Sequence, residues 1–142
     1  MTGGTGGLWA LIADGDERAA RRVAARLGRL GFWAYPTTRG DEALWLAATY
    51  PLTLAVIDTR LDDMAGPELV TRLRRADPRL PVVVTTGDGL AESEVRARRA
   101  GIVHFAPKPL DLRRLEAIVI QTLTGRGRPA YSTAAPGSPD DE

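Results

Sequence analysis

Five short apolar runs, each followed by a stretch with helical spacing, constrain this chain more than any other feature. The runs lie at 8–13, 32–35, 54–57, 82–85 and 102–105, and the helical stretches at about 17–30, 40–49, 67–76, 91–100 and 111–123. Short continuous apolar runs are typical of strands that are buried on both faces of a sheet. Their alternation with helices predicts an α/β fold, a parallel sheet with helices on both faces and right-handed crossovers.

Prolines and helical spacing predict where several of these elements end and which side chains they bury. Pro36 is expected to close the second strand, and residues 106–109 to form a loop after the last strand. In the second helix, Trp45 and Leu46 are expected to lie off the inward stripe, which consists of Ala43, Leu44 and Ala47.

Length and composition suggest one ordinary globular domain with flexible ends. A chain of 142 residues is about one domain long and can bury a single core without disulfides. We expect residues 1–7 and 124–142 to be disordered, because they are rich in Gly, Thr, Pro, Ser and Asp, and residues 8–123 to form the domain.

Charge and residue usage exclude several classes of function. The formal net charge of +1 argues against non-specific nucleic-acid binding as the main role. There is no cysteine, and His104 is the only histidine, so thiol chemistry and multi-histidine metal sites within one chain are excluded. No apolar run approaches the roughly 18 residues that cross a membrane, and residues 1–7 do not resemble a signal peptide. A cytoplasmic location is therefore expected.

Polar residues follow four of the predicted strands, and they should meet at one edge of the sheet. Ligands of open α/β sheets bind at the carboxyl ends of the strands. Asp58 follows the apolar run at 54–57 and could be a nucleophile, a metal ligand or simply the cap of a turn. The residues expected beside it are Asp14, Asp16, Thr86 and Lys108.

This arrangement resembles the receiver domain of two-component response regulators over residues 8–123. The motifs that carry the resemblance are Ile12-Ala13-Asp14-Gly15-Asp16, Val56-Ile57-Asp58, Met64-Ala65-Gly66, Val84-Thr85-Thr86-Gly87 and Pro107-Lys108-Pro109. The resemblance implies a flavodoxin-like (βα)5 fold with a doubly wound five-stranded parallel sheet in the order 2-1-3-4-5.

The resemblance also implies roles for individual residues. Asp58 would accept a phosphoryl group from a histidine kinase, a covalent reaction of a carboxylate. Lys108 would pair with one phosphoryl oxygen, and the Thr86 hydroxyl would donate to another. Phe105 would be the switch aromatic, and the Lys108–Pro109 bond would be cis.

Mg²⁺ is the cofactor that the resemblance implies, and here the chain departs from the family pattern. The expected ligands are Asp14, Asp58 and the backbone carbonyl of Arg60, with a possible contribution from Asp16 unless it only caps the following helix. Gly15 stands where the family usually has a second acid that touches the metal. Mg²⁺ binding is therefore expected to be weak.

Two functions remain open at this point, and neither is that of an enzyme. The first is a single-domain response regulator, a phosphoprotein of a phosphorelay that signals through a partner protein and not by direct DNA or membrane binding. The second is an atypical receiver that binds its partner without phosphorylation. The fourth helix, fifth strand and fifth helix are expected to form either a solvated basic face or the interface of a homodimer. Five arginines lie on these elements: Arg96, Arg98, Arg99, Arg113 and Arg114.

Overall fold

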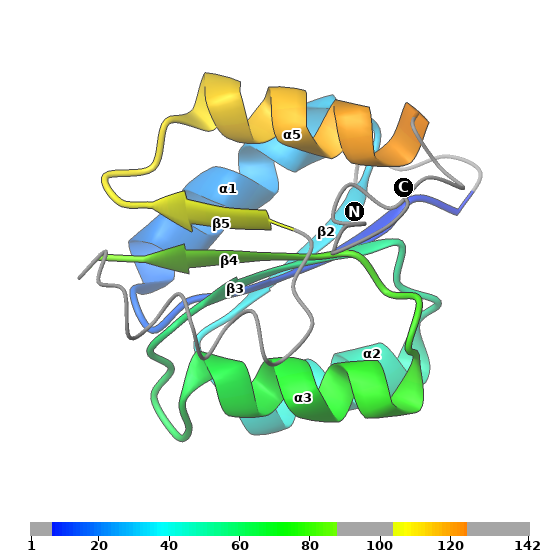
Figure 1. Ribbon diagram of the computed structural model, residues 1–142, viewed down its shortest axis with the longest axis vertical. Helices are drawn as coiled ribbons and strands as arrows, with labels where there is room; N and C mark the ends of the chain where they lie inside the picture. The colour runs from blue at the N-terminus through cyan, green and yellow to red at the C-terminus, as the bar shows by residue number, and fades with distance from the viewer. Residues whose placement is uncertain (1–6, 88–103, 125–142) are drawn as a thin grey trace, which may run out of the picture.

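The computed structural model describes residues 7–87 and 104–124, which form a parallel sheet between two layers of helices (Figure 1). The elements, in chain order, are β1 (Trp9–Ala13), α1 (Glu17–Arg29), β2 (Trp33–Thr37), α2 (Gly40–Thr49), β3 (Leu54–Asp58), α3 (Gly66–Ala76), β4 (Val82–Thr86), β5 (His104–Pro107) and α5 (Leu112–Thr124). The predicted fourth helix and residues 102–103 of the last predicted strand lie outside the described residues. No helix among the described elements is long and apolar enough to cross a membrane.

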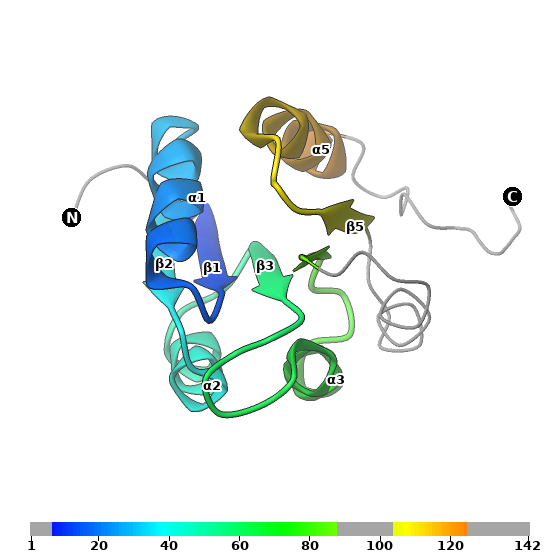
Figure 2. The ribbon, with the colours of Figure 1, turned by 90° about the vertical axis from the view of Figure 1, so that its left-hand side faces the viewer.

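The sheet has the order β2-β1-β3-β4-β5, and all four strand pairs are parallel. This confirms the predicted α/β class and strand order. Helices α1 and α5 cover one face of the sheet, and α2 and α3 cover the other (Figure 2). All parallel strands end at the same edge, so the residues that follow β1, β3, β4 and β5 are brought together there.

The central strands carry the core. Every residue of β3 and of β4 is buried, as expected for strands with helices on both sides. One hydrophobic cluster joins the sheet to α2 and α3 through residues such as Leu11, Ile57 and Leu69. The other joins it to α1 and α5 through residues such as Ile12 and Leu27.

Aromatic side chains gather at the opposite edge of the sheet, around the amino end of β1. The Trp9 ring lies 5.1 Å from the Tyr50 ring and 6.0 Å from the Trp33 ring, measured between centroids. Tyr35 stacks on Tyr50 at 4.6 Å, and the largely exposed Trp45 meets Tyr50 edge-on. This aromatic cluster therefore joins β1, β2 and α2.

Several predicted element boundaries and faces are wrong. Pro36 does not close the second strand, because β2 continues to Thr37; β2 is an edge strand, where the missing N–H of proline is tolerated. For the same reason β5, the other edge strand, includes Ala106 and Pro107, which were expected in a loop. Leu46 is buried, because it lies three residues after Ala43 and so on the same helix face.

The chain ends also differ slightly from expectation. Gly7, placed in the N-terminal segment, lies in a turn where its carbonyl accepts a hydrogen bond of 3.1 Å from the Thr53 hydroxyl. Thr124, placed in the C-terminal tail, is the last residue of α5. The rest of both predicted disordered segments lies outside the described residues.

Candidate functional site

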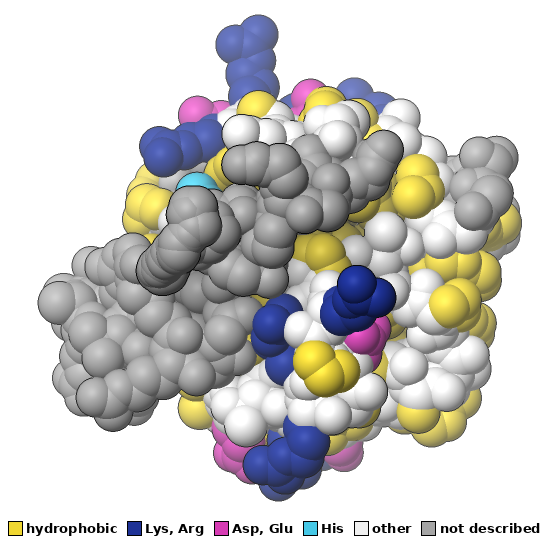
Figure 3. Space-filling view, turned by 45° about the vertical axis from the view of Figure 1, so that its right-hand side comes forward, with side chains coloured by type: hydrophobic (Ala, Val, Ile, Leu, Met, Phe, Trp, Pro, Cys, Tyr) yellow, Lys and Arg dark blue, Asp and Glu magenta, His cyan; other side chains and the backbone are white. Residues whose placement is uncertain are grey.

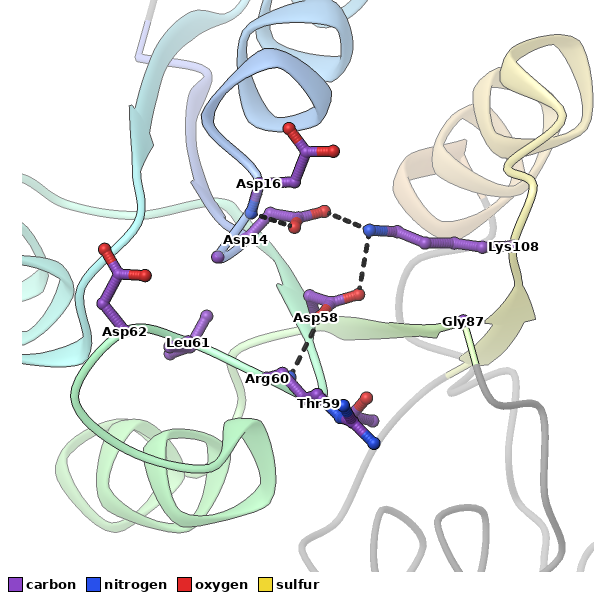
Figure 4. Close-up of a pocket in the computed structure, with 10 residues that line it drawn as sticks. Asp14, Asp16, Asp58, Thr59, Arg60, Leu61, Asp62, Gly87 and Lys108 are labelled. Carbon is purple, nitrogen blue, oxygen red and sulfur yellow. Dashed lines mark hydrogen bonds and ion pairs between the residues drawn. The ribbon is translucent and has the colours of Figure 1, made fainter.

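A pocket of about 570 Å³ opens at the carboxyl edge of the sheet. It brings together residues from the loops that follow β1, β3, β4 and β5, as the sequence predicted for this edge (Figure 4). Its lining consists of Asp14, Gly15, Asp16, Asp58, Thr59, Arg60, Leu61, Asp62, Gly87 and Lys108.

Asp58 is the last residue of β3, and the first residue of α3 packs directly against its backbone. The Gly66 N–H donates to the Thr59 carbonyl at 2.8 Å. A Cβ atom at position 66 would overlap the carbonyl oxygen of Asp58, so only glycine allows α3 to begin this close to the strand. The position of Asp58 is thus fixed by both its strand and the following helix.

Three donors from three segments hold the buried Asp58 carboxylate. Its Oδ2 atom accepts the backbone N–H of Arg60 at 3.0 Å. Its Oδ1 atom accepts the Thr85 hydroxyl at 3.2 Å and lies 3.1 Å from the Lys108 ammonium. Both oxygens of the carboxylate therefore have a partner and a defined orientation.

Lys108 bridges two carboxylates. Its Nζ atom lies 2.7 Å from Asp14 Oδ2 as well as 3.1 Å from Asp58 Oδ1 (Figure 4). Burial alone would lower the pKa of Lys108, but the hydrogen bonds and charges of Asp14 and Asp58 outweigh it and hold the pKa above its ordinary value. The ammonium is therefore cationic at neutral pH. The Lys108–Pro109 bond after it is cis, as the resemblance implies.

Asp14 is the second buried carboxylate of the pocket. Its Oδ1 atom accepts the N–H of Asp16 at 2.9 Å, while Oδ2 accepts from Lys108. Burial raises the pKa of Asp14 above its ordinary value, although these hydrogen bonds act in the opposite direction. The two carboxylates outnumber the single ammonium between them, so the pocket carries excess negative charge, which favours binding of a cation.

Asp16, for which the sequence leaves open a metal ligand or a helix cap, caps α1. Its carboxylate accepts the N–H groups of Arg18 and Ala19 at 3.0 and 3.3 Å and so caps α1. It is directed away from Asp58 in Figure 4. Among the residues that the structure describes, no three acidic or histidine side chains converge as a metal site.

Gly15 makes a close contact with the third expected metal ligand. Its N–H donates to the Arg60 carbonyl at 3.0 Å, and a Cβ atom at position 15 would lie only 2.8 Å from that oxygen. The residue that replaces the expected acid therefore also lets the loops after β1 and β3 approach each other.

The two threonines at the end of β4 direct their hydroxyls to different partners. Thr86 is fully buried, and its hydroxyl lies 3.2 Å from the hydroxyl of Thr59. The hydroxyl that contacts Asp58 belongs to Thr85, which is not among the residues predicted from the sequence. The strand pairing places Thr85 directly opposite Asp58, and a prediction of that register is the only signal that could have identified it. Phe105 is partly buried and packs against the cluster under α2 and α3.

Comparison with known proteins agrees with this geometry. The response regulator receiver domain family model matches residues 10–120. The response regulator protein PilR of Pseudomonas aeruginosa is 32% identical over 80% of this chain and 26% of its own length. The DNA-binding transcriptional regulator NtrC of Azospirillum brasilense is 31% identical over 93% of this chain and 27% of its own length. The chain thus spans about a quarter of the length of these two relatives.

A solved structure agrees with the fold. The CheY-like receiver domain protein of Methanospirillum hungatei superposes with a TM-score of 0.79 at 24% identity, covering 84% of this chain and 95% of its own. Three observations lead to one conclusion: the family match over most of the chain, the 2-1-3-4-5 order of the sheet, and the pocket with Asp14, Asp58 and Lys108. The chain belongs to the response regulator receiver domain family.

Proposed function

We propose that this receiver accepts a phosphoryl group on Asp58 from a histidine kinase or a phosphotransfer protein. The observation that carries the proposal is the Lys108 ammonium held between two buried carboxylates, one of which ends the central strand. In the reaction an Asp58 oxygen bonds to phosphorus while the phosphorus–nitrogen bond of a phosphohistidine breaks, and its electron pair leaves with the imidazole. Such a transfer depends mainly on positioning and charge neutralisation.

Three residues besides Asp58 have a task in this proposal. Lys108 pairs with a phosphoryl oxygen as a point charge, exchanging part of its contact with the carboxylates for one with the product. The Thr86 hydroxyl donates to a second oxygen after turning away from Thr59, and Phe105 responds as the switch aromatic. These two roles come from the family resemblance.

Receiver domains of this family generally bind Mg²⁺ at the phosphorylation site, and the oxygen atoms present here fit that ion in type. We propose that Asp14, Asp58 and the Arg60 carbonyl would hold it, with water completing the octahedral set. The ion, when bound, supplies positive charge that neutralises the phosphoryl oxygens. Affinity is weak, because Gly15 provides no carboxylate, Asp16 caps α1 and Lys108 already offsets one of two negative charges.

We further propose that the receiver unit, expected over residues 8–123, extends to Thr124 at the end of α5, is cytoplasmic, and signals by binding a partner protein, not DNA or a membrane directly. Part of the expected basic face lies on α5, where Arg113 and Arg114 are exposed. Figure 3 shows basic side chains at the top of the molecule, the side on which α1 and α5 lie. Arg96, Arg98 and Arg99 lie outside the described residues.

The direct test of the proposal is Asp58→Asn, which is nearly isosteric but cannot form an acyl phosphate. With acetyl phosphate and Mg²⁺, the parent should gain one phosphoryl group by intact mass, and Asp58→Asn should gain none. Asp62→Asn, which removes an exposed acid lining the same pocket, is the matched control and should react like the parent. A phosphoryl group on the Asp58→Asn protein would refute the assignment.

A second candidate function is partner binding without phosphorylation. The observation that favours it is that Gly15 replaces an acid and closes onto the Arg60 carbonyl, so the metal set is reduced. In that case Asp58→Asn would bind the partner as tightly as the parent does, and the parent would take no phosphoryl group even at high Mg²⁺ concentration.

A further inference from the structure

Adjacent threonines at the end of β4 direct their hydroxyls to different partners. Neighbouring residues of a strand point to opposite faces. Thr85 is paired with Asp58 across the sheet, and its hydroxyl lies 3.2 Å from Asp58 Oδ1. Thr86 reaches the Thr59 hydroxyl instead. Both threonines are almost completely buried, so neither hydroxyl is there merely to face solvent.

We propose that Thr85 is a positioning residue that orients the Asp58 carboxylate for phosphoryl transfer. The proposal rests on the proposed phosphorylation of Asp58. Thr85 provides the buried neutral donor to Oδ1, on a short side chain anchored in a central strand. The other partner of Oδ1 is Lys108, which has a long stem and also holds Asp14.

The difference between the two donors matters during the reaction. Lys108 shifts toward the phosphoryl oxygens as they arrive, and its hold on Asp58 Oδ1 weakens. The Thr85 hydroxyl can remain on that oxygen throughout, because the strand fixes it. Together with the Arg60 N–H on Oδ2, it limits rotation of the carboxylate about its Cβ–Cγ bond. A carboxylate kept in one orientation reacts faster than one that must first be ordered.

The test compares Thr85→Val, which keeps the shape and removes the hydroxyl, with Thr85→Ser, which keeps the hydroxyl and removes a methyl group. Initial phosphorylation rates are measured by intact mass over a range of acetyl phosphate concentrations. We expect Thr85→Val to lose about tenfold in maximal rate, as for the loss of one hydrogen bond to a charged group, with little change in the half-saturating donor concentration. Thr85→Ser should stay within about threefold of the parent.

A merely structural role would give the reverse order. At a buried site the loss of a methyl group lowers the melting temperature, so Thr85→Ser would be the more damaged variant in both melting temperature and rate. That order, or a parental rate in Thr85→Val, would overturn the proposal.

A second measurement does not depend on phosphorylation. The side-chain carboxyl carbon resonance of Asp58, observed by NMR in the unphosphorylated protein, should shift more in Thr85→Val than in Thr86→Val, since the Thr85 hydroxyl donates to the carboxylate whereas the Thr86 hydroxyl lies 3.2 Å from that of Thr59. The opposite pattern would overturn the positioning contact. A parent protein that never gains a phosphoryl group would instead refute the proposed function, while the NMR comparison still decides the role of Thr85.

Discussion

At the scale of single residues, Gly15 has two effects that oppose each other. It removes a carboxylate from the expected metal site, and it allows its own N–H to reach the Arg60 carbonyl at 3.0 Å. Replacing it by Asp would add charge but would also place a Cβ atom 2.8 Å from a backbone oxygen. Gly15→Asp therefore does not simply strengthen Mg²⁺ binding, because it also disturbs the contact between the two loops. Gly15→Ala, which adds only the Cβ atom, is the control.

The prediction is a difference in thermal shift between Gly15→Asp and Gly15→Ala. Without Mg²⁺ both variants should melt below the parent, because both must separate the two loops, and Gly15→Asp should be lower because a third carboxylate adds repulsion. Added Mg²⁺ should raise the melting temperature of Gly15→Asp strongly, that of the parent slightly and that of Gly15→Ala least. If Mg²⁺ raised the melting temperatures of the parent and of Gly15→Asp equally, weak Mg²⁺ binding by the parent would be contradicted.

The residues of the pocket were predictable to different degrees. Asp14, Asp58 and Lys108 could be placed from sequence, because each directly follows a strand and parallel strands end together. Thr85 could not, since a shift of one residue exchanges the two faces of a strand, and the pattern of residues 82–86 alone does not reveal which threonine faces Asp58. The close approach of Gly15 to Arg60 depends on two loops and has no local signal.

At the scale of elements, the segment between β3 and α3 is tied to the start of α2. The Asp63 carboxylate accepts the N–H groups of Gly40 and Asp41 at 2.6 and 3.0 Å. Helix α2 has no side-chain cap of its own, so Asp63 serves as a cap from a distant part of the chain. The hydrogen bond from Gly40 is the main cause that lowers the pKa of Asp63.

This cap predicts a stability effect with a defined pH dependence. At pH 7 the melting temperature should fall in the order parent, Asp63→Asn, Asp63→Ala, with Asp62→Asn as a nearly unchanged control. Because the pKa of Asp63 is lower in the folded state, its contribution is present above about pH 4. As the pH falls through the folded pKa, the difference between the parent and Asp63→Asn should disappear. A difference that persists at pH 2 would show that the charge is not responsible.

Element boundaries were the least predictable part of the fold. The sequence predicts Pro36 at the end of a strand and Pro107 in a loop, yet both belong to edge strands, and the edge position is known only once the strand order is known. A stripe of Ala43, Leu44 and Ala47 leaves Leu46 off the inward face, yet Leu46 is buried because it lies three residues after Ala43 on the same face of α2. The alternation of strands and helices was more robust, since it depends on many residues at once.

At the scale of the whole molecule, the sheet separates two helical layers that can serve different partners. The layer of α2 and α3 is tied to the pocket by Asp63 and Gly66. The layer of α1 and α5 exposes Arg113, Arg114 and the apolar Ile120 on α5. A helix that exposes both basic and apolar residues suits an acidic partner or a second copy of the chain.

The prediction at this scale is that Arg113→Gln combined with Arg114→Gln weakens association several-fold, measured by sedimentation of the protein alone and by partner binding. Added salt should weaken association in the parent and have less effect in the double variant. The matched control is Arg72→Gln with Arg75→Gln, two exposed positions on α3. If both pairs of substitutions weaken association equally, the effect is due to the change in net charge and not to the α5 surface.

The aromatic cluster at the amino end of β1 makes the protein's intrinsic fluorescence a reporter of one end only. All three tryptophans, at positions 9, 33 and 45, belong to that cluster. Trp9 begins β1 and Asp14 directly follows its last residue, so the two lie about 16 Å apart at the rise per residue of a strand. An event confined to the pocket should leave the emission spectrum unchanged. A spectral change on phosphorylation would therefore measure how far a signal received at one edge of the sheet is transmitted to the other.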